Sequence, residues 1–200
     1  MSKELKVNEK TGLPANLKNI AGALRATTAA VANDIKPFLK FTKTGDWIYG
    51  QDEVEVDKDE QWVINPMAAG VGYVGWGDEE HGTEGQPFGE HFAHPVLGEP
   101  MVDGDELPEI DGKWHQAIKL EFKSVEGKAE VVWKANSNGA RNCYKSVVEA
   151  IADRLEEENA FCCPVVNMTT GSYKHAKYGK ILIPVLEIVG WRNMQGQAEA

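Results

Sequence analysis

Strand-like segments follow one another after Pro37 with no helical segment between most of them, and this order constrains the fold more than any other feature of the chain. Period-two alternation begins at Phe38, and glycine, proline or acidic turns separate the segments. Successive parallel strands would need crossover helices, so the pattern favours an antiparallel sheet curled into a small barrel or sandwich. The expected strands cover residues 38–43, 47–50, 61–65, 70–76, 114–122, 129–134, 163–168 and 181–191.

One long helix is expected in the C-terminal half, from about Ser137 to Glu158, with Val147, Ile151 and Leu155 on its buried side. A weaker helical pattern covers residues 16–32. The sequence therefore predicts a mainly β (α+β) chain in three parts. These are an N-terminal lead-in with the weak helix (1–35), a single domain (36–192) with an acidic insertion (78–112), and a short tail (193–200).

The acidic insertion concentrates the negative charge of the chain. The formal net charge is −10, yet residues 78–112 alone hold 11 Asp and Glu residues and no Lys or Arg. Residues 52–60 form a second acidic segment, and the rest of the chain is mildly basic. An anionic partner is therefore not excluded, because binding follows the local potential. A loop this long and this charged is expected to be mobile, or ordered only with a partner.

The composition is typical of a globular protein, with 42% hydrophobic and 26% charged residues. The apolar stretches are shorter than the roughly 20 residues that cross a bilayer. The charged N-terminus is unlike a signal peptide. The three cysteines, two of them adjacent, do not suit a disulfide framework. These features predict a cytoplasmic protein with free thiols and no membrane partner, and they leave the oligomeric state open.

Basic and aromatic residues alternate in two segments, residues 38–49 and 173–180. Single-stranded nucleic acid needs flat rings on which its bases stack and cations along its phosphates. The alternative is that these rings belong to the core and the lysines only solubilise the chain, as we expect for Trp62, Trp133 and Trp191. The residues predicted to bind single-stranded nucleic acid are Lys40, Lys43, Trp47, Tyr49, Tyr173, Lys174, Lys177, Tyr178 and Lys180.

Catalytic motifs are not found in the sequence, which has no GxSxG, P-loop or dinucleotide-binding fingerprint. Cys162 and Cys163 begin an apolar strand, where inert buried thiols are expected. His81, His91 and His94 could bring imidazoles to one metal ion, but they lack the spacing of an HExxH motif. We therefore expect no enzyme, no catalytic residue, no metal site and no cofactor.

Short motifs occupy two regions, about residues 36–77 and 130–191. They are Phe38-Leu39-Lys40-Phe41, Trp47-Ile48-Tyr49-Gly50, Trp62-Val63-Ile64-Asn65-Pro66, Ser137-Asn138-Gly139, Cys163-Pro164-Val165-Val166, Ser172-Tyr173-Lys174-His175, Tyr178-Gly179-Lys180-Ile181 and Pro184-Val185-Leu186-Glu187-Ile188-Val189-Gly190-Trp191. Together they resemble a group of small proteins encoded by phages and prophages. Members of that group look like components of phage DNA replication and recombination modules, and their strand pattern is similar to that of phage single-stranded DNA-binding proteins with an OB-like barrel.

The resemblance implies an antiparallel OB-like barrel with one long helix in its C-terminal half. It also implies binding of single-stranded DNA without sequence preference, in the cytoplasm of the host cell. Such proteins often recruit partners through an acidic tail, whereas residues 193–200 hold only Glu199. The acidic segment 78–112 is therefore the expected contact for phage or host replication and recombination proteins.

Two other functions stay open at this point. The 11 acids of residues 78–112 would also suit a protein that imitates DNA and inhibits a host nucleic-acid enzyme. A metal-dependent enzyme that uses the histidines of the same segment is the third hypothesis. Binding of single-stranded oligonucleotides would separate the first hypothesis from the second.

Overall fold

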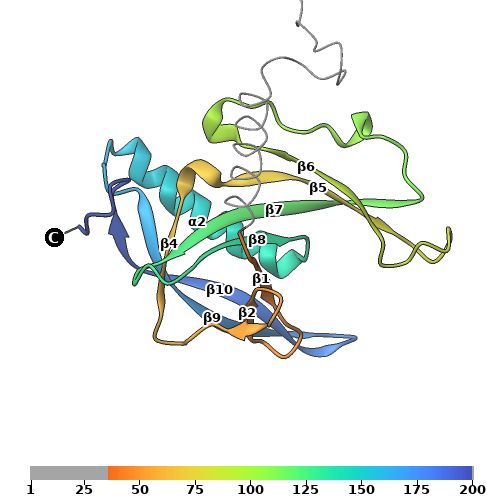
Figure 1. Cartoon of the computed structure of the whole chain (residues 1–200), viewed down its shortest axis with the longest axis horizontal. Helices are drawn as coiled ribbons and strands as arrows, with labels where there is room; N and C mark the ends of the chain where they lie inside the picture. The colour runs from red at the N-terminus through yellow and green to blue at the C-terminus, as the bar shows by residue number, and fades with distance from the viewer. Residues whose placement is uncertain (1–35, 200) are drawn as a thin grey trace, which may run out of the picture. The chain divides into compact units, whose positions relative to one another are not determined.

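The computed structural model describes residues 36–199, which form ten strands, one α-helix and three 3-10 helices (Figure 1). In chain order they are β1 (Phe38–Phe41), β2 (Trp47–Tyr49), β3 (Val54–Glu55), β4 (Gln61–Ile64), η1 (Pro66–Ala68), β5 (Gly70–Gly77), β6 (Pro87–Ala93), η2 (Pro95–Leu97), η3 (Gly104–Glu106), β7 (Gly112–Ser124), β8 (Glu130–Ala135), α2 (Asn138–Glu156), β9 (Cys163–His175) and β10 (Gly179–Arg192).

All ten strands belong to one sheet, in the order β10–β9–β4–β7–β8–β1–β2–β3, and β5 pairs with both β6 and β7. The mainly β prediction, with one long helix in the C-terminal half, is confirmed for the described residues. The prediction of a wholly antiparallel sheet is wrong, because β1 runs parallel to β8, with Phe38 beside Val132. The six strands between them, β2 to β7, serve as the crossover, so no helix is needed. The sheet does not close into a barrel.

Strand β7 organises the sheet because different parts of its length have different partners. Residues 112–119 pair with β5, residues 118–123 pair with β8, and residues 122–124 pair with β4. Its alternate side chains Ile118, Leu120 and Phe122 are buried in the core. Lys119 and Glu121, which alternate with them, therefore point to the opposite face of the sheet.

The core lies between this sheet and α2. Trp62, Trp133 and Val131 are almost fully buried, as expected for the first two. Helix α2 starts at Ser137, whose hydroxyl accepts a hydrogen bond from the Ala140 N–H at 3.2 Å, and this confirms the predicted start. The helix contacts β7, β9 and β10.

Two segments expected to be loops contain strands. Strand β6 lies inside the acidic segment 78–112 and pairs with β5 along its length, and η2 and η3 follow it. The basic segment 171–180 is mostly strand, because β9 continues to His175 and β10 begins at Gly179. In both cases pairing with a neighbouring strand overrides weak local propensity.

The weak helix predicted at residues 16–32 lies outside the described residues. Within residues 36–199, no helix has the length and apolar character needed to cross a bilayer.

Candidate nucleic-acid interface

The β9–β10 hairpin is the most basic element of the described chain. No Asp or Glu occurs between Asn159 and Leu186, whereas three lysines and one histidine fall within residues 174–180. The two strands pair continuously up to His175 and Gly179, apart from one irregularity between Ile188 and Gly190. The hairpin therefore holds a local positive charge on a chain whose net charge is −10.

Exposed aromatic rings accompany these cations. Tyr178 is 65% exposed, its ring stacks on His175 with 4.8 Å between ring centroids, and the Lys177 Nζ lies 5.2 Å from its centroid. Tyr173 is 48% exposed. The contact with His175 limits the freedom of the Tyr178 ring, which stays largely exposed beside the Lys177 cation.

The two lysines within the strands, Lys174 and Lys180, lie on the face of the hairpin opposite to Tyr173. Lys174 and Lys180 are directly opposite each other, so their side chains share one face, while Tyr173 and Ile181 share the opposite face. Both lysines are exposed. Like charges in this position repel each other, and an anion between them would relieve the repulsion.

The turn after β1 lies against this hairpin. The hydroxyl of Thr170 donates a hydrogen bond to the Gly45 carbonyl oxygen at 2.5 Å, and the indole N–H of Trp47 donates to the Thr169 carbonyl oxygen at 3.0 Å. A pocket of about 540 Å3 lies between the turn and the hairpin. The structure therefore places the turn of the segment 38–49 against the hairpin that carries the segment 173–180, with the contacts at Thr169 and Thr170.

Only part of the β1–β2 segment can contact a ligand. Lys43 is exposed, and Lys40 is exposed with its Nζ 3.7 Å from a Glu53 carboxylate oxygen. The stacking role predicted for Trp47 is wrong, because its indole is only 5% exposed and packs edge-on against Phe41 and Trp133. Tyr49 is half-buried and packs edge-on against Trp62, so it too contributes to the core.

A groove on the face of the sheet opposite the core adds residues that the sequence analysis did not select. It has a volume of about 590 Å3, and its walls are β1 with the end of β8 on one side and β5 with β6 on the other. Phe38 and Trp76 line opposite walls and are 49% and 41% exposed. The alternation of Phe38 with Leu39, which is 1% exposed, was the one signal that could have identified this face.

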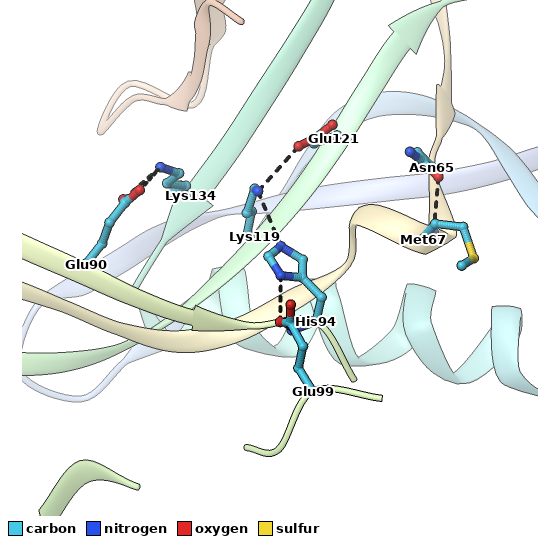
Figure 2. A network of polar contacts seen from close by, with 8 residues as sticks. All are labelled: Asn65, Met67, Glu90, His94, Glu99, Lys119, Glu121 and Lys134. Carbon is cyan, nitrogen blue, oxygen red and sulfur yellow. Dashed lines mark hydrogen bonds and ion pairs between the residues drawn. The ribbon is translucent and has the colours of Figure 1, made fainter. Parts of the chain in front are cut away.

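Lys134 is the cation that lines this groove, and Figure 2 shows it paired with Glu90. Its Nζ lies 5.2 Å from the ring centroid of Phe38 and 5.8 Å from that of Phe92. It also donates to both carboxylate oxygens of Glu90, at 2.5 and 2.7 Å, so one acid of the segment 78–112 neutralises it. The groove thus combines aromatic rings with a cation that is already paired.

A second chain of polar contacts runs beside this pair. Lys119 lies directly opposite Lys134 on the paired strand, and its Nζ is 3.4 Å from Glu121 and 3.4 Å from the Nε2 of His94. The Nδ1 of His94 lies 3.0 Å from Glu99. Figure 2 shows how these residues connect β7 to the chain that follows β6. The hydrogen bonds from His94 hold the pKa of the Glu99 carboxyl below its usual value.

The cysteines and histidines have structural contacts. Burial raises the pKa of the Cys143 and Cys163 thiols to about 11, so both are neutral at pH 7. The three cysteines are free thiols. His91 packs edge-on against Trp114 at 5.3 Å. Within residues 36–199, no group of three or more His, Cys, Asp or Glu side chains is arranged to hold a metal ion.

The comparisons with known proteins give no relative: no family model matches the chain, and neither a curated protein nor a solved structure is significantly similar to it. The resemblance to phage replication and recombination proteins therefore stays a prediction.

Proposed function

We propose that this chain is a phage-encoded protein that binds single-stranded DNA without sequence preference, in the cytoplasm of the host cell, during DNA replication or recombination. The observation that carries the proposal is the cluster of exposed rings and cations on the β9–β10 hairpin. Tyr173, Tyr178 and Lys177 lie there within residues 160–186, a stretch without acidic residues. Exposed π-faces beside cations are the requirement for sequence-tolerant binding of an unpaired strand.

The curved mixed sheet supports the same function. One strand, β7, pairs with β4, β5 and β8 along different parts of its length, and α2 packs against β7, β9 and β10. We propose that this is an OB-like arrangement in which the sheet has remained open. The fold supports this function by analogy, and the side chains of the hairpin support it through their chemistry.

The DNA-mimic alternative is favoured by the carboxylates around η3. Asp103, Asp105 and Glu106 are exposed, and no ion pair to them is found within the part of the chain that the structure describes. A mimic would bind the basic cleft of another protein and would not bind oligonucleotides.

Binding of oligonucleotides tests the proposal. We expect fluorescence anisotropy to show micromolar or tighter binding of labelled oligothymidine, about 20 nucleotides long, and weaker binding of duplex DNA. Tyr178→Ala should weaken binding about tenfold, because one stacked base contributes about 1–3 kcal/mol.

Leu155→Ala is the matched control, because Leu155 is a large exposed apolar residue on the last turn of α2. We expect it to bind like the wild type. If the wild type does not bind single-stranded DNA at low salt, the proposal is wrong and the DNA-mimic hypothesis takes its place.

A further inference from the structure

We propose that the groove between β1 and β5 is a second contact for the same DNA strand, where unpaired bases stack on Phe38 and Trp76 and a phosphate replaces Glu90 on Lys134. This inference rests on the proposed function and adds a site to it. The hairpin supplies a first set of contacts, and strand β1 connects the two: Phe38 lines the groove, and the turn after β1 contacts the hairpin at Thr170.

The shape and exposure of the groove suit a base. Its volume of about 590 Å3 is within the range of ligand sites, roughly 300–1,000 Å3. Phe38 and Trp76 are among the few large aromatic side chains that the described residues leave exposed, although burial of such rings in the core would stabilise the fold. Both belong to the walls of this one groove.

The surroundings of Lys134 indicate that its ammonium group needs an anion beside it. Its side chain is only 18% exposed, yet it lies over two rings, and its direct cross-strand neighbour is a second lysine, Lys119. Two cations in this position require counter-charges. Lys119 has Glu121 on its own strand, 3.4 Å away, whereas Lys134 depends on Glu90, a half-exposed residue of β6.

Glu90 can therefore act as an internal competitor for the phosphate. In the free protein its carboxylate makes the bidentate contact with Lys134 that a DNA phosphate would make. When a phosphate takes this position, the released carboxylate recruits a cation from solution. The exchange then adds almost nothing to the salt dependence of wild-type binding, although it adds a base-stacking site.

Two substitutions distinguish this groove from the hairpin. Phe38→Leu keeps the apolar bulk but removes the ring, and we expect it to weaken binding of oligothymidine about tenfold. Glu90→Gln frees Lys134, and we expect it to tighten binding about two- to fivefold. It should also steepen the salt dependence, adding about 0.7 to the slope of log K against log salt.

Glu106→Gln is the matched control for Glu90→Gln, because it removes one charge from the same acidic segment. Glu106 belongs to η3, whose Gly104 lies against Tyr73, and Tyr73 points to the opposite face of β5 from the groove residue Trp76. We expect Glu106→Gln to leave affinity and salt slope unchanged. Thermal unfolding of each variant checks that the fold is kept.

The outcomes separate the two proposals. If the wild type does not bind single-stranded DNA, both fail. If Tyr178→Ala weakens binding while Phe38→Leu and Glu90→Gln behave like Glu106→Gln, the groove is not a binding site and the proposed function stands. Tighter binding of oligouridine than of oligothymidine would overturn the assignment of DNA as the strand in the groove.

Discussion

The indole of Trp47 joins three parts of the chain that are far apart in sequence. Its ring packs edge-on against Phe41 at 5.2 Å and Trp133 at 5.2 Å, and its N–H reaches the Thr169 carbonyl oxygen. Aromatic pairs of this kind contribute beyond the area that they bury, and a buried N–H needs its partner. Trp47 therefore links β2 to both β8 and the β9–β10 hairpin.

We expect Trp47→Ala to lower the free energy of unfolding by about 3–5 kcal/mol, because it removes a large buried side chain. Urea unfolding followed by circular dichroism measures this change. Trp76→Ala is the control, since Trp76 is 41% exposed and should cost far less stability. A Trp47→Ala variant as stable as the wild type, with DNA binding lost, would show that the indole contacts DNA.

At the residue scale, the sequence predicted the exposure of the hairpin residues but not the burial of Trp47. Tyr173, Lys174, Lys177, Tyr178 and Lys180 are all exposed, in line with their polar neighbours. Trp47 has equally polar neighbours, Asp46 and Gly45, but its burial depends on residues more than 80 positions later in the chain. Local sequence does not contain that information.

At the scale of elements, the pairing of β5 with β6 builds one wall of the groove. Gly72 allows the two strands to approach, because a Cβ at this position would lie 1.9 Å from the carbonyl oxygen of His91. Strand β6 in turn holds Glu90, which faces Val74 in the register of the pair. A single glycine therefore helps to keep part of the acidic segment in the sheet.

Gly72→Ala should separate β6 from β5 and make the segment 78–112 easier to cleave. Because this segment has no Lys or Arg but several glutamates, limited digestion with a glutamate-specific protease is the suitable measurement. We expect faster cleavage there than in the wild type. Gly190→Ala is the control, since its added Cβ would have only an ordinary contact, 3.9 Å from Val165. Equal cleavage of both variants would show that β6 does not depend on this close approach.

The sequence predicted elements well where local preference and tertiary pairing agree. Helix α2 covers residues 138–156, close to the predicted 137–158, and the segment 61–65 matches β4. Strand β6 was not predicted because glycine, proline and acids have low strand propensity, and its pairing with β5 depends on residues elsewhere in the chain. The parallel pairing of β1 with β8 was also not predicted. The order of strands along the chain does not show which later strand will pair with β1.

At the scale of the whole molecule, charge is divided between elements. The acidic segment carries 11 of the 31 acidic residues, while the hairpin between Asn159 and Leu186 has none. Exposed charges separated by more than about 8–10 Å are largely screened at physiological salt. The hairpin can therefore attract a phosphate chain on a molecule that is acidic overall.

Two lysine substitutions test whether local or total charge controls binding. Lys177→Ala and Lys145→Ala each lower the net charge by one, but Lys177 lies beside the exposed Tyr178, whereas Lys145 is an exposed residue of α2 near Glu149. A lysine that contacts a phosphate releases about 0.7 of a counterion from a single strand. We therefore expect Lys177→Ala to lower the slope of log K against log salt by about 0.7. Lys145→Ala should leave this slope unchanged.

Anisotropy titrations with oligothymidine over a range of KCl concentrations measure the slope for both variants and the wild type. Equal changes in both variants would mean that the net charge of the protein governs its attraction to DNA. An unchanged slope in both variants would show that Lys177 does not contact the DNA. Only a change confined to Lys177→Ala agrees with a phosphate path along the hairpin, because substitution of a phosphate contact reduces the salt dependence whereas loss of a distant charge does not.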